Sequence, residues 1–356
     1  MVGTTRDKQY TEVHPLSNHN SLESRTLQDI ADLLKGLGNN SHSISHPSNT
    51  SNDDPSVLYF ERLSPQLRKL AHQEILTFAS FVTDTTNHQL RRHFHPESPA
   101  LIQVIQQKPD KFNPFRELAP SRARLKGPRG PYSQEHVRTT RGIFSAIIWR
   151  AITFGTPFAM KGPTLFASCE DFDQKRKATG KKDKTYFCDV TAYGSCNPQR
   201  CIENARTYWD SLRDGKWEAF VGTRKIGFKA SYDFFLCVKG PNLFPQLGPL
   251  TAYLLTADLS YSGVVEPPTL EEISDMVRDL NKGAANALRK MRLIPMKDSN
   301  DEANKAAYRQ AFMSMHATVL SIIPSKEHGA LFVDYILIEH MLCKFSRSYD
   351  RLNRAG

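Results

Sequence analysis

Apolar residues recur at helical spacing from Val57 to the end of the chain, and this pattern constrains the fold more than any other feature of the sequence. The first strong example follows Ser64, a typical helix N-cap residue, with Pro65 in the first turn. Its apolar side chains share one helix face: Leu67, Leu70, Ile75, Phe78 and Phe81. Because the side chains of a strand alternate with a period of two, this spacing predicts an α-helix.

Five further segments show helical signals of the same kind. They span residues 133–155, 201–222, 268–283, 301–323 and 330–352. Two shorter runs are ambiguous, because periodicity cannot assign so few residues. Residues 185–194 are predicted as a short strand or an extended loop, and residues 231–240 as a helix or a strand. No internal repeat and no heptad run is found, so the sequence predicts an all-α or nearly all-α fold.

Capping residues predict where two of these helices begin. Ser133 is expected to cap the helix in residues 133–155. Thr269 and Glu272 form a capping-box pair at the start of the segment that is expected to close at Gly283.

The first 56 residues have a different composition. They are rich in Ser, Asn, Thr and His, and they can bury too little apolar surface to offset the entropy of ordering. We therefore expect a mostly disordered tail over residues 1–56 and a helical domain over residues 57–356. Residues 27–38 interrupt the tail with a short amphipathic helix pattern.

The chain carries 47 Lys and Arg against 37 Asp and Glu, a net charge of +10. A positive balance favours a polyanionic partner through attraction and counterion release. Basic residues gather in residues 122–129 and 175–184, which are both expected to be loops. They could contact backbone phosphates or be ordinary solvated surface, and the second could be a nuclear-localisation patch.

The sequence predicts an intracellular protein without a membrane span. It has no signal-peptide pattern at its start and no apolar run near the roughly 20 residues that a span requires. The six cysteines are irregularly placed, which suits a reducing compartment. The spacing of Cys188, Cys196 and Cys201 is a poor match to a zinc site, so we expect free cysteines and no metal.

Residues 244–261, FPQLGPLTAYLLTADLSY, combine a Pro/Gly turn with an apolar helix that carries one acid. Leu247, Leu254, Asp258 and Tyr261 fall on one helix face. Two alternatives stay open for Asp258: a buried, hydrogen-bonded structural acid, or an acid that lines a pocket and acts on a substrate. The turn at Gly248 has the residue pattern of a helix-hairpin-helix motif, in which backbone amides at the start of the second helix can bind a phosphate.

Four segments carry a resemblance to a known family: IFSAIIWRAITFG, which holds Arg150, LGPLTAYLLTADLSY, NKGAANALRKM and MLCKFSRSYDRL. They resemble the helical family that includes the helical domains of 5-hydroxymethyluracil DNA kinases and the α-glutamyl/putrescinyl thymine pyrophosphorylases. The resemblance covers about residues 135–354 and implies a helix-hairpin-helix DNA-glycosylase-like fold. It further implies a nuclear protein that binds duplex DNA with a modified, flipped pyrimidine, and no cofactor is expected.

The resemblance also implies roles for individual residues. Asp258 and Tyr261 would line the base pocket as the catalytic pair. A second set would hold phosphates: Gly248, Thr251, Lys282, Gly283, Arg150, Lys344 and Arg347.

Several positions depart from the patterns of this fold. Leu250 stands where bifunctional glycosylases carry a lysine, and Glu266 is the nearest acid where they carry an Asp. Gln246 and Asn281 stand where the family has glycines. No G-x-x-x-x-G-K-[ST] phosphate loop is present, so a nucleotide kinase is not supported. Two functions stay open: a DNA-base-modifying or modified-pyrimidine-recognising protein, and a non-catalytic basic helical protein that binds nucleic acid or acts as a scaffold.

Overall fold

The computed structural model describes residues 59–188, 202–237, 243–297 and 301–352. The chain divides into two units, residues 1–48 and 49–356, and the described residues all belong to the second. The predicted disordered tail and the helix expected at residues 27–38 therefore lie outside the described residues.

The described chain is helical, as the apolar spacing predicts, and contains no strand apart from one isolated bridge between Ile226 and Val265. The elements of its first half are η1 (Tyr59–Arg62), α2 (Pro65–Gln89), α3 (Pro99–Gln107), α4 (Pro109–Phe112), η2 (Arg116–Leu118), α5 (Pro120–Lys126), α6 (Thr140–Ile147), η3 (Ile148–Thr153), α7 (Pro157–Lys161), α8 (Cys169–Lys177) and α9 (Lys184–Phe187).

The second half is built in the same way. Its elements are α10 (Asn204–Leu212), α11 (Lys216–Val221), α12 (Phe228–Leu236), α13 (Pro249–Tyr261), α14 (Leu270–Leu280), α15 (Gly283–Lys290), α16 (Glu302–Ile322), η4 (Ser325–Glu327), α17 (His328–Leu331) and α18 (Tyr335–Leu352). No helix within the described ranges has the length and apolar character that a membrane span needs.

Two of the predicted helix starts are confirmed. The Ser64 side chain accepts a hydrogen bond from the Leu67 amide at 3.3 Å, which caps α2. At α14 the capping box of Thr269 and Glu272 is complete in both directions.

The prediction that Ser133 caps a helix is wrong. The helix α6 begins seven residues later, where the Thr139 hydroxyl accepts from the Gly142 amide at 3.2 Å. Residues 131–139 form hydrogen-bonded turns instead, and Tyr132 and Val137 are buried in them. A Cβ at Gly142 would collide with the His136 carbonyl, so this turn packs directly on the new helix.

Residues 231–236 belong to α12, so the helical alternative is confirmed there. Other predictions need correction. Residues 184–187 form the short helix α9 rather than a strand or loop, while residues 189–194 and 238–240 lie outside the described residues. The predicted basic loops are partly helical: residues 122–126 lie in α5 and residues 175–177 end α8. The expected long helix at 330–352 is interrupted after Leu331, and Asp334 caps α18 by accepting from the Leu337 amide at 2.8 Å.

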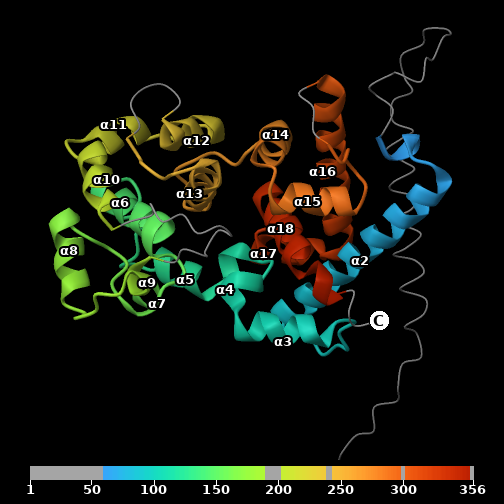
Figure 1. Ribbon diagram of the computed structural model, residues 1–356, viewed down its shortest axis with the longest axis horizontal. Helices are drawn as coiled ribbons and strands as arrows, with labels where there is room; N and C mark the ends of the chain where they lie inside the picture. Colours follow the sequence, from blue (N-terminus) through green and yellow to red (C-terminus); the bar gives the residue numbers. More distant parts are fainter. Residues whose placement is uncertain (1–58, 189–201, 238–242, 298–300, 353–356) are drawn as a thin grey trace, which may run out of the picture. The chain divides into compact units, whose positions relative to one another are not determined.

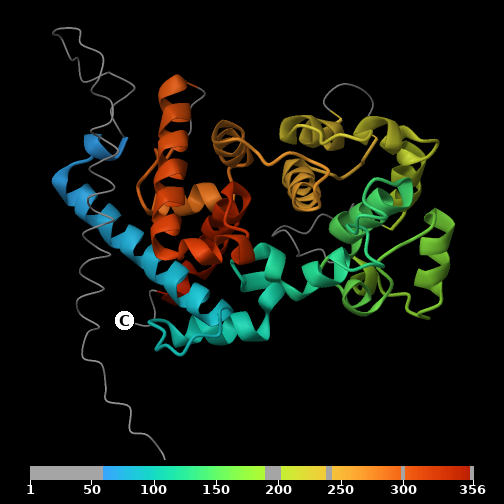
Figure 2. The same cartoon turned by 180° about the vertical axis from the view of Figure 1, so that it is seen from behind.

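Two helix pairs determine where the site residues lie. The helices α12 and α13 lie side by side, and the Ser231 and Thr256 hydroxyls meet between them at 3.3 Å (Figures 1 and 2). Most residues of α13 are buried, which explains why this helix is apolar on every side. The helices α15 and α18 pack so closely that a Cβ at Gly283 would lie 2.6 Å from Cys343 Sγ. Gly283 is therefore required by packing.

Candidate functional site

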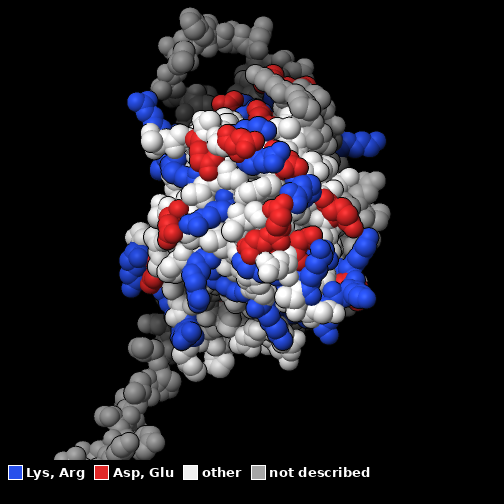
Figure 3. All heavy atoms as spheres, turned by 90° about the vertical axis from the view of Figure 1, so that its left-hand side faces the viewer, with Lys and Arg blue, Asp and Glu red and all other residues white. Residues whose placement is uncertain are grey.

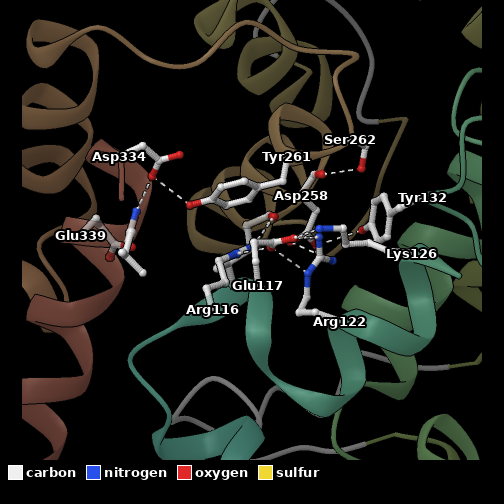
Figure 4. A network of polar contacts seen from close by, with 12 residues as sticks. Arg116, Glu117, Arg122, Lys126, Tyr132, Asp258, Tyr261, Ser262, Asp334 and Glu339 are labelled. Carbon is white, nitrogen blue, oxygen red and sulfur yellow. Dashed lines mark hydrogen bonds and ion pairs between the residues drawn. The ribbon is translucent and has the colours of Figure 1, made fainter. Parts of the chain in front are cut away.

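Asp258 lies at the centre of a buried polar cluster (Figure 4). Its carboxylate is 0% exposed, and the four side chains that contact it come from segments more than 100 residues earlier in the chain. We call the group of Arg116, Arg122, Lys126, Arg150, Glu117 and Asp258 the arginine cluster.

Both carboxylate oxygens of Asp258 are paired. Oδ1 accepts from Arg116 Nη2 and lies 3.2 Å from Arg122 Nη1. Oδ2 accepts from the Tyr132 hydroxyl at 2.9 Å and from Arg150 Nε at 3.1 Å, with Arg150 Nη2 as a second donor. This side chain is therefore enclosed by other side chains, not by backbone groups.

Aromatic rings hold two of the arginines in place. The Arg150 guanidinium lies 4.5 Å from the Trp149 ring centroid and 5.3 Å from that of Phe154. The Arg122 guanidinium lies 4.7 Å from the centroid of Tyr132. Arg150 also stands in the π-helical turn η3, a geometry that is frequent at functional sites.

Glu117 is the second acid of the cluster. Its Oε1 accepts from Arg122 Nε at 2.9 Å, and its Oε2 accepts from Lys126 Nζ at 3.0 Å. Three arginines and one lysine thus face two carboxylates, so the cluster carries an excess of positive charge.

These charges keep Asp258 ionised. Burial alone would raise the pKa of its carboxyl, but the adjacent Arg122, Arg150 and Arg116 outweigh burial and hold that pKa well below its usual range. The pKa of the Tyr132 hydroxyl is raised, first by burial and then by the Asp258 charge. A carboxylate in this state is a poor general base, because its proton affinity is low and its oxygens are occupied.

A pocket of about 410 Å³ adjoins the arginine cluster. Its lining residues are Lys126, Pro128, Tyr132, Ser133, Gln134, Glu135, Tyr261 and Ser262. Asp258 does not line the pocket. Tyr132, which does, lies between the pocket and Asp258 and donates to its carboxylate. Tyr261, predicted together with Asp258, does line the pocket.

The hydroxyl of Tyr261 is already engaged with the C-terminal helices. It donates to Asp334 Oδ1 at 2.9 Å (Figure 4). The Tyr261 ring packs edge-on against Phe332. Eight residues earlier on the same helix, the Tyr253 hydroxyl donates to Glu339 Oε2 at 3.0 Å. Burial raises the pKa values of both acids, Asp334 and Glu339.

The turn at residues 244–248 leads directly into α13. Gly248 is the N-cap of α13 and is exposed, whereas Thr251 in the first turn is buried. Gln246 has a φ of +69° and Asn281 a φ of +47°, so both residues adopt the left-handed conformation that glycine would adopt freely. The two amide residues thus hold a turn conformation that residues other than glycine rarely adopt.

The remaining predicted phosphate contacts are separated. Arg150 belongs to the arginine cluster, and Lys282 is exposed at the N-cap of α15. Lys344 is buried and donates to the Lys111 carbonyl at 2.7 Å, and Arg347 donates to the same carbonyl at 3.3 Å. Burial lowers the pKa of Lys344 to about 7. Both side chains therefore bind the end of α4.

The basic segment at residues 122–129 is mostly engaged inside the protein. Arg122 is in the arginine cluster, and Arg124 donates to the Ala159 and Gly162 carbonyls. The expectation of a phosphate-binding loop is therefore wrong for Arg122, because Asp258 and Glu117 bind it in the interior.

The other basic segment is more open. Lys161, Lys181, Lys182 and Lys184 are exposed and form no ion pair with any described residue; we call them the lysine strip. Lys161 ends α7, which packs against α9, where Lys184 is the first residue. Figure 3 shows this side of the protein, with Asp and Glu interspersed among Lys and Arg.

The sequence pattern did not identify Arg116, Glu117 or Tyr132 as site residues. They fall in a Pro/Gly/Arg-rich stretch that has no helical spacing. The only signal in the sequence was the charged pair Arg116–Glu117 within the apolar run FNPFREL.

Within the described ranges, no group of three or more His, Cys, Asp or Glu residues could hold a metal ion. Cys188 is buried, and Cys196 and Cys201 lie outside the described residues. No protein-family model matches the sequence, and no curated protein or solved structure matches it either.

Proposed function

We propose that the chain binds nucleic acid as a non-catalytic helical module. The observation that carries this proposal is the lysine strip, where four ammonium groups are exposed without an ion-pair partner among the described residues. Ammonium groups of this kind can neutralise phosphates and release counterions. The net charge of +10 and the resemblance to DNA-acting helical proteins support the same function and imply a nuclear location.

The state of Asp258 supports binding over chemistry. An acid that activates a substrate must touch it, but Asp258 is fully buried and occupied by three arginines and Tyr132. In this arrangement its charge compensates the arginines, so its role is structural.

The lysine strip is tested by replacing Lys181, Lys182 and Lys184 together with Gln. We expect weaker binding to a duplex oligonucleotide in fluorescence anisotropy, with the slope of log K against log salt reduced by up to about 3, because each ammonium that neutralises a phosphate contributes close to one. The matched control replaces Lys69, Lys297 and Lys326, which are exposed elsewhere on the protein. Equal slopes for the two triple variants would contradict the proposal.

A second candidate function is modification or recognition of a 5-hydroxymethyl-pyrimidine. The observation that favours it is the pocket beside the arginine cluster, lined by Tyr132 and Tyr261. Duplexes that contain thymine, 5-hydroxymethyluracil or 5-hydroxymethylcytosine would be incubated with the protein and analysed by mass spectrometry. We expect no altered or released base; a mass change that disappears in Tyr261→Phe, which alters a pocket residue at a small cost in stability, would instead support catalysis.

A further inference from the structure

Ser133 lines the pocket and carries a buried hydroxyl without a partner among the described residues. Its side chain is more than nine-tenths buried, and its Oγ has no hydrogen-bond partner among the described residues. The same residue lines the pocket next to the arginine cluster. A buried hydroxyl without a partner is destabilising, and rotation of the Ser133 side chain to another rotamer would let its Oγ meet a polar group bound in the pocket.

Lys126 supplies positive charge to the same pocket. Its side chain is 29% exposed, and its carboxylate partner, Glu117, is shared with Arg122. Its ammonium also lies 4.7 Å from the ring centroid of Phe332, which holds it against the wall formed by Tyr261. Lys126 is therefore only partly neutralised.

The charges around the pocket favour an anion. Behind it, four cations of the arginine cluster face two carboxylates. At its edge Glu135 is paired with Arg141 at 3.2 Å, and Asp334 is bound to the Tyr261 hydroxyl. An anionic ligand would balance the excess positive charge.

The size and the aromatic lining define the ligand further. A bare phosphate would occupy a small part of about 410 Å³. Tyr261 adds aromatic surface to the lining, which suits a planar ring, whereas Tyr132 is only 3% exposed. We propose that this pocket binds a nucleoside phosphate, with its phosphate held by Lys126 Nζ and, after rotation of its side chain toward the pocket, by Ser133 Oγ.

The same chemistry is present in a free mononucleotide and at the end of a strand. The pocket proposal does not depend on the lysine strip, because the two involve different residues. If the protein binds duplex DNA but no mononucleotide, only the pocket proposal is overturned. If it binds a mononucleotide but no duplex, only the proposed function is overturned.

The test is isothermal titration calorimetry with thymidine 5′-monophosphate, thymidine and inorganic phosphate, on wild type, Ser133→Ala and Lys126→Gln. We expect the monophosphate to bind at least about tenfold more tightly than thymidine. Lys126→Gln should weaken the monophosphate about tenfold or more, and Ser133→Ala about three- to tenfold. Matched controls are Lys69→Gln and Ser260→Ala, which alter residues outside the pocket lining.

Folding is checked by the melting temperature. Ser133→Ala removes a buried hydroxyl that has no partner among the described residues, so we expect it to melt at or above the wild-type temperature without ligand. Oligonucleotides with a 5′-phosphate or a 5′-hydroxyl then separate the sources: a preference for the phosphate identifies a strand end, and equal affinity identifies a free nucleotide. No monophosphate binding, equal affinity for thymidine, or wild-type affinity in both variants would overturn the proposal.

Discussion

Asp258 and Glu339 are both buried acids that accept a hydrogen bond from a tyrosine, yet their surroundings act on their charge in opposite directions. Three arginines contact Asp258, and the pKa of its carboxyl is lowered. Glu339 accepts from the Tyr253 hydroxyl but pairs with no arginine of the described chain, and burial raises its pKa. The difference shows that cations in direct contact, more than burial, decide whether an acid of this interior stays ionised.

The largest effect is expected from Asp258→Asn. The variant leaves Arg116, Arg122 and Arg150 without their shared counter-charge, and breaking a buried ion pair from one side costs about 3–5 kcal/mol. Urea unfolding measures the destabilisation. Asp214→Asn, at an exposed turn position, is the control and should change the unfolding free energy by less than about 0.5 kcal/mol. A cost below about 1 kcal/mol for Asp258→Asn would show that the arginines do not depend on this acid.

A smaller effect is expected where the partner of the acid is a tyrosine. Tyr253→Phe removes the hydroxyl that satisfies Glu339 in a fully buried site, which should cost about 1–3 kcal/mol. Tyr261→Phe is the matched variant and should cost less, about 1 kcal/mol, because Asp334 keeps the Leu337 amide as a donor. Guanidinium chloride unfolding measures the loss of unfolding free energy in each variant. A larger loss in Tyr261→Phe than in Tyr253→Phe would mean that the remaining donors do not distinguish the two acids.

Local patterns predicted the helices and the position of Asp258 on a buried face. Apolar spacing and caps act over a few residues, so the start of α2 at Ser64 and the capping box at Thr269 could be predicted from the sequence. The Pro/Gly pattern likewise predicts the turn before α13, but it does not predict the left-handed conformation of Gln246 within that turn.

The contacts of Asp258 could not be predicted in this way. Its arginine partners Arg150 and Arg116 lie 108 and 142 residues earlier, and no local spacing encodes so distant a pairing. Arg122 was instead assigned to a basic loop, since composition does not tell a buried arginine from an exposed one. The lysines at residues 181–184 were found by composition because they are exposed and form no ion pair with the described residues.

The smallest effect is a difference in pH dependence. Because the pKa of Glu339 is raised on folding, its stabilising contribution is complete below its unfolded pKa of about 4.3 and is lost as the pH rises through the folded value. Relative to wild type, Glu339→Gln should therefore gain unfolding free energy as the pH rises above about 4, by less than about 1.4 kcal/mol per pH unit.

Asp258→Asn should show the opposite trend in the same urea titrations. The lowered pKa of Asp258 gives a contribution that is present above the unfolded pKa of about 3.9 and is lost as the pH falls through the folded value. The unfolding free energy of Asp258→Asn should therefore approach that of wild type only at acidic pH. Parallel pH profiles for the two variants would mean that both acids titrate alike, and the arginines could then no longer be held responsible for keeping Asp258 charged.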